Sequence, residues 1–122
     1  MINKICTSIE QSNKLLSLGL DPSTADMYWW YSGKRYYVES MDDDDFNKES
    51  DIPAWSLSAL LDILAKETHN IDEDGYVVLS SYKGNWWNIS PINCISEEIN
   101  ESNNPIDAAF ELICWLKENG KL

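Results

Sequence analysis

The run Met27-Tyr-Trp-Trp-Tyr-Ser-Gly-Lys-Arg-Tyr-Tyr-Val-Glu39 predicts a β-hairpin. Its outer parts, residues 27–31 and 35–39, are rich in aromatic and β-branched side chains, which favour strands. The short loop between them, residues 32–34, contains a glycine, as tight hairpin connections commonly do. We therefore expect two antiparallel strands joined by this loop.

A second hairpin is predicted further along the chain. Residues 76–79 and 86–89 form the strand-like runs, and a Lys-Gly-Asn turn at residues 83–85 lies between them. Each hairpin is followed by a segment with helical periodicity, which indicates a weak internal ββα repeat. Four strands are therefore expected in total.

Helical periodicity marks the remaining apolar segments. Residues 4–18 and 54–66 carry apolar side chains at three- and four-residue spacing, which predicts two amphipathic helices. Gly19 is a suitable terminator of the first helix, and Pro22 prevents its continuation. Pro53 suits the first turn of the second helix.

The C-terminal helix has the clearest signals. Asn103 or Asn104 can cap its N-terminus, and Pro105 suits its first turn. Asp107 favours the positive end of the helix dipole. Gly120 is the expected end of the helix.

The predicted element order is thus α-β-β-α-β-β-α. Hairpins that alternate with helices indicate the α+β class, with a four-stranded, mainly antiparallel sheet packed with three helices. A length of 122 residues fits a single domain over residues 1–122. Hydrophobic residues make up 43% of the sequence, which is enough for a core.

The net charge is strongly negative. Twenty-one acidic residues against nine basic ones give a formal net charge of −12. Direct binding to nucleic acid or to an anionic membrane is not expected, because both need clustered Lys and Arg. The charge favours a protein partner with a basic surface. The excess falls in residues 39–51 (−6), 67–74 (−4) and 97–101 (−3), between the predicted elements, so it fits a solvated rim.

The cysteines indicate neither a disulfide framework nor a metal site. Cys6, Cys94 and Cys114 are dispersed and form no C-x-x-C pair, so no zinc ribbon or redox motif is predicted. Cys6 and Cys114 fall in apolar helical patterns, where buried, reduced thiols are expected. The first residues lack the apolar run of a signal peptide, and no stretch approaches transmembrane length. We expect a cytoplasmic location.

Two acidic stretches are candidates for cation binding. Residues 70–77 place oxygen ligands at alternate positions before Gly75, as calcium loops do. The twelfth position, which should carry a bidentate Glu, is Ser81, and Tyr76 begins a predicted strand. Residues 42–45 are four consecutive aspartates, a pattern typical of solvated loops. No metal site and no cofactor are therefore predicted.

Catalytic motifs are not evident. A Cys–His or Ser–His site needs a base, and the only histidine, His69, lies beyond the end of a predicted helix among polar residues. No G-x-S-x-G elbow, phosphate-binding glycine loop or H-E-x-x-H motif occurs. We therefore expect a protein that is not an enzyme.

The aromatic strands are the better functional clue. Strand periodicity places Tyr37, Tyr76, Val78 and Trp86 on one face of the predicted sheet. If helices cover only the other face, these side chains form an exposed surface suited to a partner. If a helix covers this face too, they belong to the core. Both alternatives stay open.

Three blocks of the sequence are similar to those of a known family. The blocks are Leu18-Gly-Leu-Asp-Pro-Ser-Thr-Ala-Asp-Met27 with Trp29-Trp30, Ile52-Pro-Ala-Trp-Ser-Leu-Ser-Ala-Leu-Leu61, and Asn104-Pro-Ile-Asp-Ala-Ala-Phe110 through Trp115-Leu-Lys-Glu-Asn119. They resemble a family of short acidic bacterial proteins that are often encoded on phage-like or mobile elements and have no assigned function. The resemblance implies a cytosolic protein of mobile-element origin and carries no catalytic residue.

The loop of residues 21–26 is the first candidate for a functional patch. It presents Asp21, Ser23, Thr24 and Asp26 beside the first aromatic strand. Capping and turn formation are the alternative explanation of these polar side chains.

The function predicted is that of a non-enzymatic interaction or adaptor protein. The predicted binding residues are the four polar residues of the loop together with Tyr37, Tyr76 and Trp86. The alternative is an acidic nucleic-acid mimic that occupies the basic cleft of a DNA-binding protein, since carboxylates can imitate phosphate charge. A small enzyme or a metal-binding domain is a third possibility.

Overall fold

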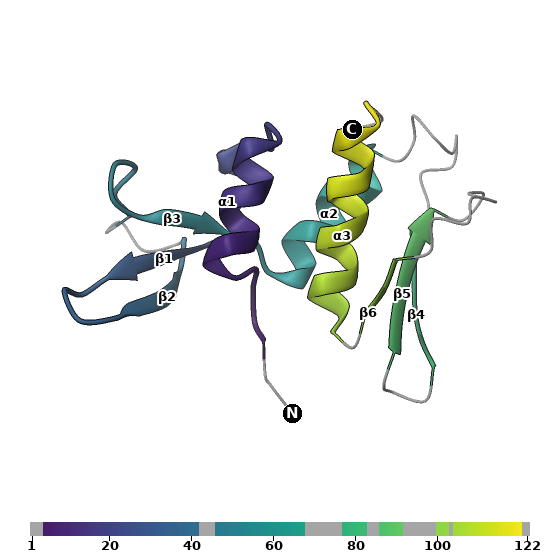
Figure 1. Cartoon of the computed structure of the whole chain (residues 1–122), viewed down its shortest axis with the longest axis horizontal. Helices are drawn as coiled ribbons and strands as arrows, with labels where there is room; N and C mark the ends of the chain where they lie inside the picture. The colour runs from purple at the N-terminus through teal and green to yellow at the C-terminus, as the bar shows by residue number, and fades with distance from the viewer. Residues whose placement is uncertain are drawn as a thin grey trace.

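The computed structural model describes residues 4–41, 46–67, 77–82, 86–91, 100–102 and 104–120, and this part of the protein has an α+β fold. Its elements in sequence order are α1 (Ile9–Ser17), the short 3-10 helix η1 (Pro22–Thr24), β1 (Met27–Tyr31), β2 (Tyr36–Ser40), β3 (Ile52–Ala54), α2 (Leu57–Glu67), β4 (Val77–Tyr82), β5 (Trp86–Pro91), β6 (Asn100–Ser102) and α3 (Pro105–Glu118). Figure 1 shows the α-helices between two sheets, with β1, β2 and β3 on one side and β4, β5 and β6 on the other.

The first sheet has the strand order β2-β1-β3, and both pairs of neighbours are antiparallel. In its register Trp30 lies opposite Tyr37, and Tyr28 lies between Glu39 on one side and Pro53 on the other. Because side chains alternate along a strand, all five belong to the same face of this sheet. The opposite face carries the residues between them.

The second sheet has the strand order β4-β5-β6 and is also antiparallel throughout. β4 and β5 pair over their full lengths, from Val77 opposite Pro91 to Tyr82 opposite Trp86. β5 and β6 pack against α3, whereas α1 packs against β3 of the first sheet. The helices therefore connect two sheets that do not share a strand.

The hydrophobic core lies among the three helices. Its buried members are Leu15, Leu20, Ala25, Trp55, Ala59, Leu60, Ile63, Leu64, Ile106, Ala108, Ala109, Leu112, Ile113, Cys114 and Leu116. Leu60 and Leu64 on α2 are one turn apart, as are Leu112 and Leu116 on α3, and all four are at most 1% exposed. This spacing explains why α2 and α3 pack together along their apolar faces.

The first helix begins later than the prediction of residues 4–18. Ser8 accepts a hydrogen bond from the Gln11 N–H, and the Gln11 side chain accepts one from the Ser8 N–H, so a capping box sets the start at Ile9. Before the helix, the Thr7 N–H donates to the Trp55 carbonyl. Gly19 has a φ of +91° and follows the helix as its terminator, as predicted.

The start of the middle helix was predicted wrongly as well. Pro53 lies in β3 rather than in a first helical turn, and α2 begins at Leu57 instead of residue 54. Ser56 supplies the cap, because its hydroxyl accepts from the Ala59 N–H. Pro53 is tolerated in β3 because β3 lies at an edge of the sheet.

The C-terminal helix confirms the prediction. Asn104 caps it by accepting a hydrogen bond from the Ile106 N–H at 2.8 Å, and Pro105 is its first residue. Asp107 lies in the first turn. Gly120, with a φ of +67°, follows the end of the helix.

The predicted sheet needs the largest correction. The α+β class, the three helices and both hairpins are present in the described part of the protein, but the strands form two three-stranded sheets instead of a single four-stranded one. The extra strands are β3 and β6, each of three residues. Each pairs with one strand of a hairpin and makes it the central strand of its sheet. The predicted order α-β-β-α-β-β-α therefore lacked these two short strands as well as η1.

Candidate functional site

The loop end of the β1–β2 hairpin carries a group of exposed aromatic rings. Tyr31, Tyr36 and Tyr37 are 55%, 43% and 37% exposed. Tyr31 and Tyr36 are cross-strand neighbours with ring centroids 5.0 Å apart. Trp30 and Tyr37 form the next cross-strand pair, stacked with a centroid distance of 5.1 Å. Because neighbouring pairs alternate between faces, aromatic rings are presented on both faces of the hairpin.

A basic turn lies beside these rings. The Arg35 guanidinium carbon lies 4.7 Å from the centroid of the Tyr37 ring, and Arg35 Nε donates to the Tyr37 hydroxyl at 2.8 Å. Lys34 precedes it in the loop. In Figure 1 this loop points away from the three helices, so the hairpin presents its aromatic and basic groups together. We call Trp30, Lys34, Arg35 and the three exposed tyrosines the hairpin tip.

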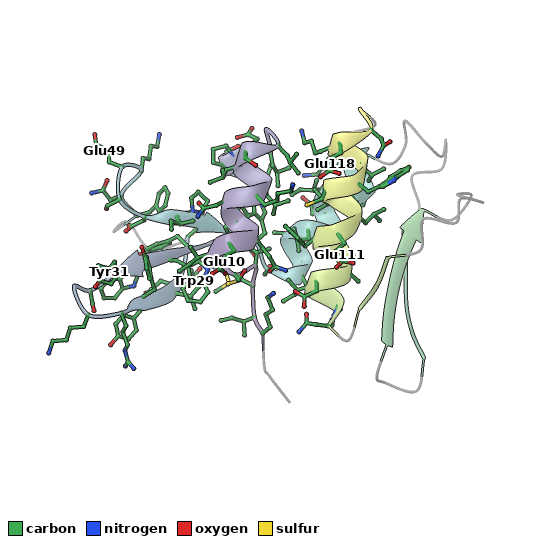
Figure 2. The ribbon with its side chains drawn as sticks, in the orientation of Figure 1. Glu10, Trp29, Tyr31, Glu49, Glu111 and Glu118 are labelled. Carbon is green, nitrogen blue, oxygen red and sulfur yellow. The ribbon has the colours of Figure 1, made fainter. Side chains whose placement is uncertain are left out.

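The other end of β1 is tied into the protein. Trp29 Nε1 donates to the Thr7 carbonyl at 3.0 Å, and Tyr28, which is 2% exposed, makes an edge contact with the Phe46 ring. Figure 2 shows Tyr31 toward the outer end of the hairpin and Trp29 nearer to α1. The aromatic residues at the start of β1 therefore anchor the strand to the protein, whereas those at its end are exposed.

The loop of residues 21–26 has mainly structural contacts. Asp21 caps η1 by accepting from the Ser23 N–H at 2.9 Å, and Thr24 accepts from the indole N–H of Trp55 at 2.9 Å. Asp26 accepts two hydrogen bonds from Ser56, one from its N–H at 2.9 Å and one from its hydroxyl. Thr24 and Asp26 therefore position the Trp55 side chain and the start of α2.

Asp21 and Ser23 also line a pocket of about 440 Å³. Its apolar walls are Pro22, Ala25, Met41, Phe46 and Pro53, and Lys48 is its cationic member. Hydrogen bonding by Ser23, chiefly by its backbone N–H, lowers the pKa of Asp21, so the carboxylate is ionised at neutral pH. Among the described residues, the lining thus combines apolar walls with one negative and one positive group.

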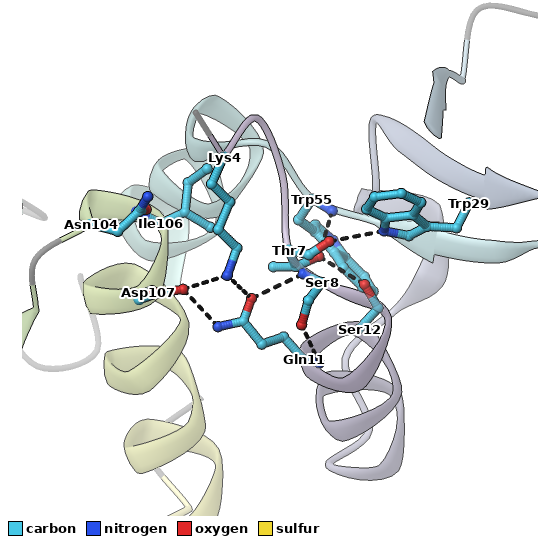
Figure 3. A network of polar contacts seen from close by, with 10 residues as sticks. All are labelled: Lys4, Thr7, Ser8, Gln11, Ser12, Trp29, Trp55, Asn104, Ile106 and Asp107. Atoms are coloured by element: carbon cyan, nitrogen blue, oxygen red, sulfur yellow. Dashed lines mark hydrogen bonds and ion pairs between the residues drawn. The ribbon is translucent and has the colours of Figure 1, made fainter. Parts of the chain in front are cut away.

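A polar network joins the N-terminal segment to the rest of the molecule (Figure 3). Lys4 Nζ pairs with Asp107 Oδ1 at 2.5 Å, and Gln11 Nε2 donates to the same oxygen at 2.8 Å. On the other side, the buried Thr7 hydroxyl is 2.8 Å from that of Ser12 and accepts from the Trp55 N–H at 3.1 Å. The network fixes α1 between α3 and the first sheet.

The described thiols are buried and unreactive. Desolvation raises the pKa of Cys6 and of Cys114 to about 11. Nearby acids, Asp26 at Cys6 and Glu118 with Glu111 at Cys114, add to this effect. Because the thiolate is the nucleophile, neither cysteine is suited to covalent chemistry at neutral pH.

Metal-binding clusters and membrane-spanning helices are both absent from the described residues. Within these residues, no group of three or more His, Cys, Asp and Glu side chains is arranged to hold a metal ion. Likewise, none of the helices there is long and apolar enough to cross a membrane.

The predicted binding residues do not form one surface. Tyr37 lies at the hairpin tip, Asp21 and Ser23 lie at the pocket, and Thr24 and Asp26 make the structural contacts given above. Trp86 belongs to β5 of the second sheet, on the other side of the helices from Tyr37 (Figure 1). The prediction that Tyr37 and Trp86 lie on one face of the same sheet was therefore wrong, because their strands belong to two different sheets. Tyr76 lies outside the described residues.

Sequence reasoning missed the other half of the pocket. Met41, Phe46 and Lys48 lie in or beside the acidic segment, which was interpreted only as a solvated rim. The apolar residues Met41 and Phe46 on either side of the aspartate run were the available signal. Pairing of β1 with β3 then brings this segment to the loop of residues 21–26.

Comparison with known proteins finds no matching family model, no similar curated protein and no similar solved structure.

Proposed function

We propose that the protein is a non-enzymatic interaction module that binds a partner protein through its hairpin tip. The observation that carries this proposal is the exposure of Tyr31, Tyr36 and Tyr37 on both faces of one projecting hairpin. Contiguous exposed aromatic groups mark interaction sites, and Tyr, Trp and Arg contribute most to the binding energy of protein interfaces.

The hairpin tip is already ordered for binding. Trp30 and Tyr37 hold each other by cross-strand stacking, and the Arg35 side chain is held against the Tyr37 ring. Side chains that are fixed before association lose little conformational entropy when a partner binds. The same contacts thus support both the shape of the hairpin and its affinity for a partner.

The local charge of the tip defines the partner surface. Lys34 and Arg35 make the loop basic, although the whole protein has a net charge of −12. A groove with apolar walls and an acidic rim would contact the rings on both faces and the two cations at the loop. We therefore propose that the partner protein contacts the hairpin tip with an acidic groove. The net charge of the whole protein had favoured a partner with a basic surface.

No described feature favours a nucleic-acid mimic. Residues 42–45, 68–74 and 97–99, which carry most of the acidic excess, lie outside the described residues. That alternative stays a prediction.

Site-specific photo-crosslinking tests the proposal. A photoreactive phenylalanine analogue is placed at position 31 or 36 of the full-length protein in its native host, and at Ile5 as a control. Ile5 is a matched position because it is 56% exposed and lies outside the hairpin. We expect one protein to be crosslinked from both tyrosine positions but not from Ile5. Crosslinks of equal yield from all three positions, or none from the hairpin, would contradict the proposal.

The purified partner then gives the affinity. We expect Tyr31→Ala with Tyr36→Ala to weaken binding about tenfold or more, and Ile5→Ala to leave it unchanged. Lys34→Gln with Arg35→Gln should weaken binding and reduce its salt dependence if the groove is acidic. Tighter binding of this charge variant would assign a basic contact surface instead.

A further inference from the structure

The pocket beside η1 contains two opposite charges that do not pair with each other. Asp21 and Lys48 both line it, yet among the described residues neither has an ion pair within 4.0 Å. Both side chains are exposed, so each charge is accessible to a ligand at the pocket. A ligand that carries a cation and an anion would meet both groups at once.

The backbone on both sides of the pocket is held in place. On one side, the Asp21 carbonyl accepts from the Thr24 N–H and hydroxyl. On the other side, the turn that carries Lys48 is closed by Asn47 and Asp51: the Asn47 N–H donates to the Asp51 carboxylate, and the Asp51 N–H donates to the Asn47 carbonyl. The backbone positions of Asp21 and Lys48 are thus set by the fold.

Apart from Asp21, Ser23 and Lys48, the described lining residues are apolar. Pro22 and Pro53 have fixed backbones, and Phe46 is packed against the buried Tyr28 ring. The volume of about 440 Å³ lies within the usual range of ligand pockets, roughly 300–1,000 Å³. Mostly apolar walls with a few polar groups are typical of sites for small molecules.

We propose that this pocket binds a small apolar zwitterion, of which a free apolar α-amino acid is the simplest member. The ammonium group faces Asp21, the carboxylate faces Lys48, and the apolar group of the ligand contacts the proline and Phe46 walls. This site is separate from the hairpin tip and goes beyond the proposed interaction function. A peptide terminus offers only one of the two charges, so the same chemistry distinguishes a free ligand from a partner segment.

Methyl NMR of the full-length protein with labelled methionine tests the proposal. Met41 lines the pocket, and Met27 in β1 is an internal reference outside it. The probes are L-phenylalanine, N-acetyl-L-phenylalanine and L-phenylalaninamide, which carry both charges, the carboxylate alone and the ammonium alone. We expect L-phenylalanine to shift the Met41 signal with a low-millimolar Kd and each single-charge probe to bind roughly fivefold more weakly.

Two charge variants assign the contacts. Asp21→Asn retains an oxygen that can cap η1, and we expect it to weaken binding of L-phenylalanine and its amide but not of the N-acetyl probe. Lys48→Gln should weaken the binding of L-phenylalanine and of the N-acetyl probe but not the binding of L-phenylalaninamide. Glu49→Gln and Lys117→Gln are the matched controls, because they change charge by the same amounts outside the described pocket lining, and they should leave all three affinities unchanged.

Three results would overturn the proposal. One is the absence of a saturable Met41 shift up to about 20 mM of L-phenylalanine, well above the expected Kd. Another is equal binding of the three probes, which would mean that the charges are not used. The last is an equal loss in Glu49→Gln and Asp21→Asn, which would show a general charge effect. Preferential binding of the N-acetyl probe would instead assign the pocket to the terminal carboxylate of a peptide.

Discussion

Thr7 illustrates how much one buried hydroxyl can contribute. It is 0% exposed, accepts from the Trp55 N–H and shares a hydrogen bond with Ser12. Thr7→Val keeps the shape of the side chain but leaves both partners buried without this oxygen. We expect the free energy of unfolding to fall by about 2 kcal/mol, measured by urea denaturation.

A double variant separates this effect from loss of packing. Ser12→Ala removes one of the groups that Thr7→Val leaves unsatisfied, so Thr7→Val with Ser12→Ala should cost less than the sum of the single changes. Additive costs would show that the two hydroxyls are not coupled.

The buried thiols predict a pH dependence. Cys6 and Cys114 have a native pKa of about 11 against an ordinary value of 9.0. Below pH 9 both states hold the thiol proton, whereas between pH 9 and 11 the unfolded state loses it first, so stability falls as pH rises through this window. We expect the unfolding free energy of the wild type to fall more steeply there than that of Cys6→Ala with Cys114→Ala. Parallel pH profiles for the two proteins would count against this assignment.

At the scale of the element, Ser56 determines where α2 begins. Its hydroxyl accepts a hydrogen bond from the Ala59 N–H. The Ser56 N–H and hydroxyl both donate to the Asp26 carboxylate. We expect Ser56→Ala to lower the unfolding free energy by about 1 kcal/mol and the Tm by about 4 °C, measured by circular dichroism. Ser58, exposed on the same helix, is the control: Ser58→Ala should be neutral or slightly stabilising, because alanine is the better helix former. Similar losses in both variants would refute the capping role.

Elements with strong local signals could be predicted from the sequence. α3 has its cap, its first-turn proline and its terminal glycine in the sequence itself, and β1 matches the aromatic run 27–31. β3 could not be predicted, because three residues that include Pro53 have no strand pattern of their own. Its pairing with β1 stabilises it, and the same proline at the edge was mistaken for a helix start. α1 was extended backwards because apolar spacing does not show that Thr7 pairs with Trp55.

At the scale of the whole molecule, α1 is joined to α3 by few polar contacts. Lys4 and Gln11 both meet Asp107 in the first turn of α3. We expect Asp107→Ala to lower the unfolding free energy by about 1 kcal/mol and to speed hydrogen exchange in residues 4–17 about fivefold. Glu111→Ala, one turn further along α3, should not change exchange in residues 4–17. Equal acceleration in both variants would show that α3 itself is loosened.

The division into two sheets could not be predicted, and the candidate sites depend on it. Periodicity says which residues share a face of one strand, but it does not say which strands pair. Tyr37 and Trp86 were therefore placed together, whereas the helices separate them (Figure 1). Asp21 was singled out by its local polarity, but Lys48 reaches the same pocket only through the pairing of β1 with β3. Local chemistry is visible in a sequence, and long-range pairing is not.

The polar network around the N-terminal segment has a consequence for synthesis on the ribosome. Thr7 meets Trp29 after 22 further residues and Trp55 after 48, whereas Lys4 meets Asp107 only after 103. The first sheet and the N-terminal segment that contacts it can therefore assemble while the rest of the protein is still being translated. Attachment of α1 to α3 must wait until translation has passed Asp107. The order of the elements thus lets the first sheet form early in synthesis. The ion pairs that join the N-terminal part of the protein to α3, Lys4–Asp107 and Lys14–Glu118, form late.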